Sequence, residues 1–451
     1  MPGEPGQSAG GLFGPIVTTD ALLTATSDRG WVQAMLDAEA ALARAEEALG
    51  IVPAGSAAAI TRSCEAGLFD IDAIGRAARL GGNPVIPLVA ELRAKVPDPA
   101  GEWVHWGATS QDILDTASML VASRSTALID ADLTGLCEAT AELCDRHRST
   151  LMVGRTLLQH ALPITFGLKA AGWLAAASEG RLALRLVRRR LPVQLGGAAG
   201  TLASLGDRGP DVLGAMADSL ELAVPPLPWH ADRAVVAELA AALGLLAGIG
   251  SKIAWDVALM MQTEVGEAFE PSAPGRGGSS TLPHKRNPVA AAAVSSAHRQ
   301  ASALVSVIFG GMASEHERAV GGWQAEWETL TSLLRLAGGV TANVRETVAG
   351  LEVDAAAMSR NLGLTGGLLM SERVVLALSP ATGRAEAVRA VQDAAARCAV
   401  SNRSFADELL DDPSVKAHLS PAELGELLDP GSYLGSTQLF IDRVLDAYRN
   451  G

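Results

Sequence analysis

The sequence is poor in aromatic residues, which occupy 4% of its 451 positions, although hydrophobic residues in total occupy 48%. A core must therefore be built from aliphatic and alanine side chains, and this composition favours close-packed helices over sheets. Charged residues account for only 19%, which leaves ample apolar area for a large core and argues against disorder. These proportions predict an all-α protein.

Cysteine is also scarce, and the patterns that use it for chemistry are absent. The sequence contains no C-x-x-C pair and no H-E-x-x-H motif, so neither a redox pair nor a zinc site is expected. The amino-terminal residues lack the basic stretch and apolar run of a signal peptide. We therefore expect a cytoplasmic protein whose four cysteines stay reduced in the core: Cys64, Cys137, Cys144 and Cys398.

Positive charge is in deficit, because 36 lysines and arginines face 50 aspartates and glutamates for a net charge of −14. This balance gives no overall basic surface for nucleic acid or an anionic membrane. The longest run without a charged residue, 191–206, has 16 residues, whereas a membrane span needs about 20 apolar ones. If the substrate is an anion, the positive charge that binds it must be local.

Hydrophobic periodicity dominates the rest of the sequence. Residues 28–50 repeat apolar side chains every three or four positions and end at a glycine, which predicts a helix. Longer helices are expected over five further stretches: 111–147, 163–190, 231–269, 288–312 and 324–350.

One stretch within these helices, 239–261, is apolar on nearly every face and is interrupted only by Lys252 and Asp256. Such a helix is buried on most sides, either inside one subunit or between subunits. Beyond residue 355 the expected helices become shorter, and no alternating strand pattern or internal repeat stands out. The sequence thus predicts a three-part all-α fold in which a long-helix bundle lies between two helical domains: 1–110, 111–355 and 356–451.

The segment 275–288 is the most informative for function and reads GRGGSSTLPHKRNP. Its final proline suits the first turn of the next helix, and a helix N-terminus beside Lys285 and Asn287 attracts a carboxylate. Its glycine-rich half carries Ser279 and Ser280 and could close over such a site as a lid. An equally good interpretation is a solvated glycine linker that carries basic residues incidentally.

A second segment, 103–116, reads WVHWGATSQDILDT. Either Thr109 or Ser110 is a good N-cap for the helix expected from about residue 111, and free hydroxyls at a helix start also bind anions. His105 lies just upstream. Taken alone, His105 is equally well explained as a histidine satisfied by a backbone carbonyl.

A third segment, 154–167, reads GRTLLQHALPITFG between two apolar helical runs. If its polar side chains Arg155, Gln159 and His160 are buried, they need partners, either each other or a ligand. On its own the segment is interpreted as a loop followed by a capped helix.

A fourth segment, 315–327, reads EHERAVGGWQAEW and predicts a bend between two long helices. Arg318 is a candidate carboxylate clamp, because a guanidinium can bind a carboxylate through two parallel hydrogen bonds. A salt-bridged helix face is an equally good interpretation.

In this order the four segments resemble the conserved regions of the fumarase/aspartase superfamily, and the resemblance covers essentially the whole chain. The PHKRNP form of the loop resembles two branches, adenylosuccinate lyase and 3-carboxy-cis,cis-muconate cycloisomerase. The lyase branch would carry a histidine acid at position 157 and another within 82–89, where this sequence has Leu157 and GNPVIPLV. A lyase that expels a purine nitrogen needs a proton donor, so the sequence is more similar to the cycloisomerase branch. Members of that branch often carry tryptophan at position 157.

The resemblance implies a dienoic tricarboxylate as substrate, one of whose carboxylates adds to a C=C bond. The addition places negative charge on the carbon next to another carboxylate, and Lys285 and Asn287 are the implied donors that stabilise it. Ser279 is the implied proton donor, with Ser280 as the alternative. His160 is a candidate to relay the proton.

The resemblance also implies how the rest of the substrate is held. Neither a metal nor an organic cofactor is expected, and the only implied partners are the small tricarboxylate and other copies of the chain. In this superfamily the central helices pack as a homotetramer, and each site is built from three subunits. The candidates for holding the remaining carboxylates are His105, Thr109, Ser110, Arg155, Gln159 and Arg318.

Two other functions remain open. One is a C–N lyase of the same superfamily that resembles adenylosuccinate lyase, and Leu157 is the residue that argues against it. The other is a non-catalytic structural member that kept the fold and lost activity. The presence of Ser279, Lys285 and Asn287 argues against that second alternative.

Overall fold

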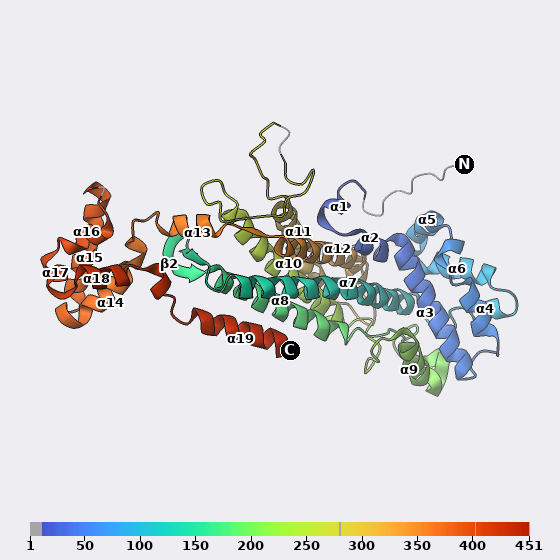
Figure 1. Cartoon of the computed structure of the whole chain (residues 1–451). Helices are drawn as coiled ribbons and strands as arrows, with labels where there is room; N and C mark the ends of the chain where they lie inside the picture. The colour runs from blue at the N-terminus through green and yellow to red at the C-terminus, as the bar shows by residue number, and fades with distance from the viewer. Residues whose placement is uncertain (1–10, 279–280, 402, 451) are drawn as a thin grey trace. The chain divides into compact units, whose positions relative to one another are not determined.

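The computed structural model describes residues 11–278, 281–401 and 403–450 (Figure 1). Helices dominate these residues, and the strands among them are short, so the predicted all-α class is confirmed. The chain divides into two compact units, each built from three stretches of sequence. Unit 1 comprises Met1–Gly135, Glu179–Ala254 and Ala290–Arg345, and unit 2 comprises Leu136–Ser178, Trp255–Val289 and Glu346–Gly451.

The amino-terminal part of unit 1 consists of short and medium helices around α3. The predicted helix over 28–50 is confirmed as α3 (Asp28–Ala48), whose N-cap Ser27 accepts a hydrogen bond from the amide of Gly30 at 3.1 Å. One face of α3 is fully buried, including Met35 and Leu42. The other helices here are α1 (Gly14–Val17), α2 (Asp20–Ala25), α4 (Ser56–Ser63), α5 (Ile71–Gly81), α6 (Val85–Lys95) and, later in the chain, α9 (Gly209–Leu220).

Five long helices carry residues of both units, and each falls close to a predicted stretch. Two of them are shorter than predicted. The helix predicted over 163–190 begins at Phe166, because the residues before it belong to a strand, and the helix predicted over 231–269 ends at Met260. The five are α7 (Ser110–Arg146), α8 (Phe166–Arg188), α10 (Ala234–Met260), α11 (Val289–Gly311) and α12 (Gly322–Ala349). Short 3-10 helices are η1 (Ala66–Leu68), η2 (Ala100–Trp103), η3 (Ala203–Arg208), η4 (Leu368–Met370) and η5 (Pro430–Ser432).

Helix α10 contains all but the last residue of the stretch 239–261, which the sequence analysis expected to be buried. Within the described residues it is the one helix long and apolar enough to cross a membrane, judged by length and composition. However, 56% of its most apolar window is buried inside the protein. The core helix of a soluble protein has the same properties.

A buried ionic cluster in unit 1 joins α7, the loop before α10, and α12. Arg233 is only 3% exposed and donates two hydrogen bonds to Asp115, at 2.9 and 3.0 Å. It also donates to Glu326, whose carboxyl has a raised pKa because it is buried. The indole N–H of Trp323 completes the set by donating to Asp115 at 2.9 Å. A buried guanidinium is tolerated here because two carboxylates share its charge.

Unit 2 contains the strands that the sequence pattern did not reveal. Strand β1 (Leu151–Thr156) pairs antiparallel with β2 (Gln159–Thr165), so the segment interpreted as a loop is a β-hairpin. A second pair consists of β3 (Ala268–Phe269) and β4 (Glu352–Val353). The alternation is hard to see in β2 because its sequence, QHALPIT, runs four apolar residues together.

The carboxy-terminal helices of unit 2 are shorter than the central ones, as predicted. Their core is aliphatic around the fully buried Phe405, with Val374, Val391 and Leu409. These helices are α13 (Ala355–Leu362), α14 (Ser371–Thr382), α15 (Arg384–Ser401), α16 (Phe405–Leu410), α17 (Pro413–His418), α18 (Pro421–Leu427) and α19 (Thr437–Asn450).

Replacing the buried arginine should destabilise the protein strongly. In Arg233→Met, Asp115 and Glu326 lose their shared counter-charge, and we expect the free energy of unfolding to fall by about 3–5 kcal/mol. Urea unfolding followed by circular dichroism measures the loss. The exposed pair of Arg190 with Glu238 provides the control, and Arg190→Met should change stability little. Equal effects of the two substitutions would contradict the stabilising role of the cluster.

Candidate active site

The start of α7 in unit 1 carries the first group of predicted residues. Thr109 directly precedes the helix and Ser110 is its first residue. The side chain of Asp112 accepts a hydrogen bond from the amide of Thr109 at 2.9 Å, and the amide of Asp112 donates back to the carbonyl of Thr109. Thr109 therefore occupies the N-cap position, which leaves its hydroxyl free to contact other groups.

The guanidinium of Arg318 lies at this helix start. It donates to the hydroxyl of Thr109 at 3.2 Å and to the carbonyl of Ala198 at 3.2 Å. Both acceptors are neutral, and no carboxylate in the described part of the chain pairs with Arg318. The charge of Arg318 is thus left without a carboxylate partner beside the hydroxyl of Thr109. Such an arrangement suits a carboxylate ligand.

Asp112 serves a structural role in this arrangement. Its side chain is fully buried and accepts hydrogen bonds from the amides of Gly196 and Gly197, each at 2.9 Å, and contacts Nε2 of His230 at 2.6 Å. These contacts hold the loop that supplies the carbonyl of Ala198. The sequence analysis noted the run 191–206, which contains this loop, only for its lack of charge and did not connect it with the site.

His105 is held by a residue that the sequence analysis also missed. Its Nδ1 lies 2.6 Å from Oε1 of Glu39, a carboxylate on α3 that is 1% exposed. Burial alone would lower the pKa of His105, but the charges of Glu39 and Asp112 outweigh burial and the nearby Arg93, so the pKa is raised. His105 also has a positive φ of 63°, a conformation that the surrounding structure must stabilise.

In unit 2, the β1–β2 hairpin carries the second group. Its turn consists of Leu157 and Leu158, both with positive φ, which is the geometry of a type I′ turn. Leucine is unfavourable there, and both side chains are exposed, by 96% and 75%. Gln159 is exposed next to the turn and pairs with Thr156 across it. The hairpin therefore presents apolar and amide groups at its tip.

Arg155 is engaged within unit 2. Its two terminal nitrogens donate to the two oxygens of Glu267, at 2.7 and 2.8 Å, and Glu267 is fully buried. The amide of Asn361 donates to the same carboxylate at 2.7 Å. In this structure Arg155 therefore fixes the hairpin to the rest of unit 2, and its fork is not open to a carboxylate ligand.

His160 lies opposite Arg155 in the hairpin. Burial and the charge of Arg155 lower its pKa, and Glu267 opposes this shift. Its Nδ1 is buried and makes no hydrogen bond to a described residue. A neutral imidazole with a free nitrogen can accept a proton and pass it on, as a relay requires.

The loop of residues 275–288 is closed at its base. The amide of Asn287 donates to the carbonyl of Gly277 at 2.8 Å, and Gly278 bridges to Arg286. Arg286 in turn donates to Glu352 at 2.9 Å. This base holds the turn that presents Lys285.

Lys285 itself is exposed and makes no ion pair with a described residue. The predicted serines Ser279 and Ser280 lie outside the described residues. Of the predicted residues that are described, four belong to unit 1 and five to unit 2. Those in unit 1 are His105, Thr109, Ser110 and Arg318, and those in unit 2 are Arg155, Gln159, His160, Lys285 and Asn287.

Comparison with known proteins assigns the chain to a family. A family model described as lyase matches residues 15–302, and one described as adenylosuccinate lyase C-terminus matches residues 367–444. The chain therefore belongs to this lyase family, and the predicted membership of the fumarase/aspartase superfamily is confirmed.

Individual relatives match over nearly their whole length. The chain is 47% identical to a 3-carboxy-cis,cis-muconate cycloisomerase of Bradyrhizobium diazoefficiens, over 97% of this chain and 98% of the relative. It is 46% identical to a nitrosuccinate lyase of Streptomyces davaonensis, over 96% and 94%. The solved structure of 3-carboxy-cis,cis-muconate lactonizing enzyme from Pseudomonas putida superposes with a TM-score of 0.93 at 44% identity, covering 97% of this chain and 99% of that one.

Removing the partner of His105 should give a stability loss that depends on pH. In Glu39→Gln we expect unfolding to become easier by about 1–3 kcal/mol at pH 6, because a charge-assisted hydrogen bond is lost. Since the pKa of His105 is raised in the folded state, its contribution is complete below its unfolded pKa of about 6.5 and disappears as the pH rises through the folded value.

Urea unfolding at pH 6 and pH 9 measures this difference. A second comparison, between His105→Asn and the double variant His105→Asn with Glu39→Gln, isolates the interaction of the pair. In the His105→Asn background, Glu39→Gln should lower the free energy of unfolding by less than it does in the wild type. A loss that is the same at both pH values, or unchanged in the His105→Asn background, would show that Glu39 acts independently of His105.

Proposed function

We propose that this chain catalyses the conversion of 3-carboxy-cis,cis-muconate to 4-carboxymuconolactone without a cofactor. The observation that carries the proposal is a full-length similarity to cycloisomerases combined with Leu157, an apolar residue where the resemblance to adenylosuccinate lyase would require a histidine acid. An intramolecular addition has no external leaving group. It therefore does not need such an acid.

The free cations of the site match the charge of this substrate. Its three carboxylates need more than one positive partner, and Arg318 and Lys285 each make no ion pair with a described residue. His105 pairs with the buried carboxylate of Glu39 and therefore adds no third free charge. Arg155 is excluded from this set by its bidentate pair with Glu267. Thr109 supplies a neutral hydroxyl that contacts Arg318, Ser110 supplies another at the first residue of α7, and Gln159 supplies an amide at the hairpin.

The reaction forms one C–O bond and one C–H bond while a C=C π bond is lost, so substrate and product are isomers. As the carboxylate oxygen adds, the π electrons move onto the carbon next to another carboxylate. Lys285 and Asn287 stabilise that charge. Ser279, or alternatively Ser280, then protonates the carbon. The serine is reprotonated through His160, which takes a proton from solvent at one ring nitrogen as it gives one from the other, so the proton gained by the substrate comes from water. A serine hydroxyl is a poor acid in water, so the loop must close for this step.

An exposed apolar face of α8 bears on how the enzyme assembles. Leu182 and Leu186 are each 53% exposed and lie four residues apart on one face of α8. An apolar stripe of this kind suits packing against another helix, and we propose a homotetramer in which sites are shared between subunits. The enzyme would act in the cytoplasm, in the breakdown of protocatechuate through the β-ketoadipate pathway.

A lyase acting on nitrosuccinate is the second candidate. The nitrosuccinate lyase relative, at 46% identity, falls within the range of the cycloisomerase relatives, which are 42–47% identical to this chain. Its substrate is a dicarboxylate, which the same cations could bind. Leu157 does not favour one over the other, because it departs from the tryptophan frequent among cycloisomerases.

An ultraviolet assay of the purified protein separates these functions. We expect rapid loss of the diene absorbance of 3-carboxy-cis,cis-muconate, unaffected by EDTA, and no turnover of adenylosuccinate. Turnover of nitrosuccinate at a higher kcat/KM would replace the proposal with the second candidate, and cleavage of adenylosuccinate would show that another group replaces the missing histidine acid. Inactivity on all three would favour a structural role.

Substitution of the loop lysine tests its role directly. Lys285→Ala should lower kcat by roughly 100- to 1,000-fold, because a charge that stabilises the developing carbanion is lost. Steady-state kinetics with the oligomeric state checked by light scattering measures the effect. The exposed Lys416 on α17 is the matched control. A similar kcat for Lys285→Ala and wild type would remove Lys285 from the mechanism.

Two adjacent glycines test whether the geometry at the base of the 275–288 loop affects activity. A Cβ on Gly277 would lie 2.6 Å from the carbonyl oxygen of Asn287, at a φ of 65°, whereas a Cβ on Gly278 would meet nothing within 4 Å. Gly277→Ala should therefore lower kcat/KM roughly tenfold or more through strain, and Gly278→Ala should change it less. The reverse order would contradict the proposed closure of the loop base.

A further inference from the structure

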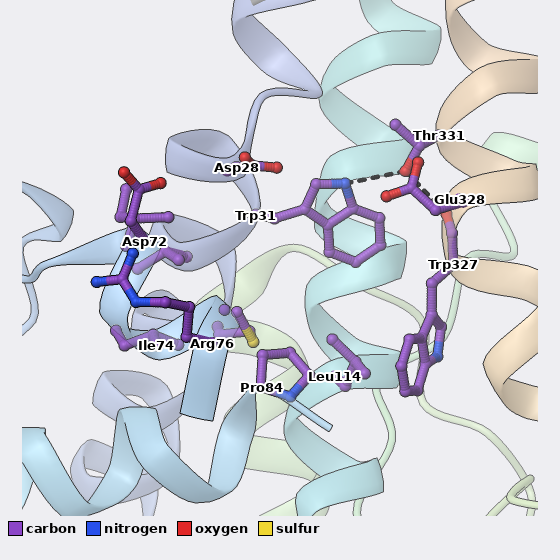
Figure 2. A pocket seen from close by; sticks show the side chains of 14 residues that line it. Asp28, Trp31, Asp72, Ile74, Arg76, Pro84, Leu114, Trp327, Glu328 and Thr331 are labelled. Atoms are coloured by element: carbon purple, nitrogen blue, oxygen red, sulfur yellow. Dashed lines mark hydrogen bonds between the residues drawn. The ribbon is translucent and has the colours of Figure 1, made fainter. Parts of the chain in front are cut away.

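Unit 1 contains a cavity that none of the predicted active-site residues lines. It has a volume of about 510 Å³ and lies among α3, α5, α7 and α12 (Figure 2). Leu114 is its one contribution from α7, four residues beyond the first residue of that helix. The cavity is therefore a separate site from the group formed by Thr109, Ser110 and Arg318.

The walls of this cavity are mainly apolar and include two indoles, Trp31 and Trp327. The N–H of Trp31 donates to the hydroxyl of Thr331 at 3.1 Å, which fixes its ring (Figure 2). Trp327 packs edge-on against Trp323, with ring centroids 4.9 Å apart. Both indoles are thus held in place before any ligand arrives, which reduces the entropic cost of binding.

The charges at the cavity are mostly negative. Asp28, Asp72 and Glu328 face a single cation, Arg76. All four are exposed, and none makes a hydrogen bond or ion pair with another described residue. An anion such as a tricarboxylate is disfavoured by this excess. A cation is attracted both by the carboxylates and by the faces of the indole rings.

We propose that this cavity is a binding site for a small organic cation, specifically an amine with a flat apolar body. The apolar body would occupy the space between the indoles, Met35 and Leu114. The ammonium group would lie toward the carboxylates of Asp28, Asp72 and Glu328. The site is distinct in position and in charge preference from the one proposed for catalysis.

Three probes of similar size test the charge preference on the purified full-length protein. They are 2-phenylethylamine, which is cationic at pH 7, the neutral 2-phenylethanol, and the anionic 3-phenylpropanoate. By isothermal titration calorimetry we expect the amine to bind about tenfold more tightly than the anion, with the alcohol between them. Equal affinities, a preference for the anion, or no binding of any probe would overturn the proposal.

Gly75 offers a matched pair of variants that locates the binding. This residue lines the cavity from α5, and a Cβ built on it meets nothing within 4 Å. Gly75→Phe should place a ring in the cavity and abolish amine binding. Gly75→Ala should leave the space open and retain amine binding at the wild-type affinity.

Both variants must first give the wild-type circular dichroism spectrum and oligomeric state. Wild-type affinity in Gly75→Phe would place the amine elsewhere on the protein and overturn the assignment. Loss of amine binding in Gly75→Phe, together with retention of amine binding in Gly75→Ala, supports the assignment of the amine to this cavity. Asp72→Asn should then weaken the binding of 2-phenylethylamine and leave the affinity for 2-phenylethanol unchanged, since only the charge of the side chain is removed.

Discussion

The candidate site in unit 1 depends on two carboxylates buried in the first turns of α7. Asp115 is neutralised by Arg233, which also pairs with Glu326, and Asp112 binds His230 and two loop amides. Burying a carboxylate costs several kcal/mol unless it is paired and hydrogen-bonded. Four stretches far apart in sequence must therefore meet at the start of α7. Their meeting sets the positions of the N-cap hydroxyl and of the arginine that donates to it.

The cations near the candidate site residues fall into two groups: those that pair with buried carboxylates, and those that stay unpaired and can bind a ligand. Arg233 and Arg155 each make a bidentate pair with a buried carboxylate, so the donors used in those pairs are not available to a substrate. Arg318 and Lys285 make no such pairs in the described part of the chain. In an acidic protein with a net charge of −14, a few uncompensated cations are enough to define where an anion binds.

The helices could be predicted because an apolar repeat of three to four residues is a local signal, and α3 and the five long helices followed it. The β1–β2 hairpin could not, because its turn uses two leucines where asparagine and glycine are usual. The motif residues of the site could be predicted from the sequence, because each motif is a continuous segment. The pair of Glu39 with His105 was not, since it joins residues 66 positions apart and depends on tertiary packing. The resemblance also could not show that Arg155 is held by Glu267.

The central proposal is that each active site is shared between copies of the chain, and Arg318 and Lys285 are the two residues that test it. Subunit mixing tests it most directly. Arg318→Ala and Lys285→Ala are each expected to be nearly inactive as pure oligomers. After co-refolding in equal amounts, activity on 3-carboxy-cis,cis-muconate should recover to about a quarter of wild type, because some sites then receive both intact residues from different chains. Mixed oligomers that form but remain inactive would contradict the account.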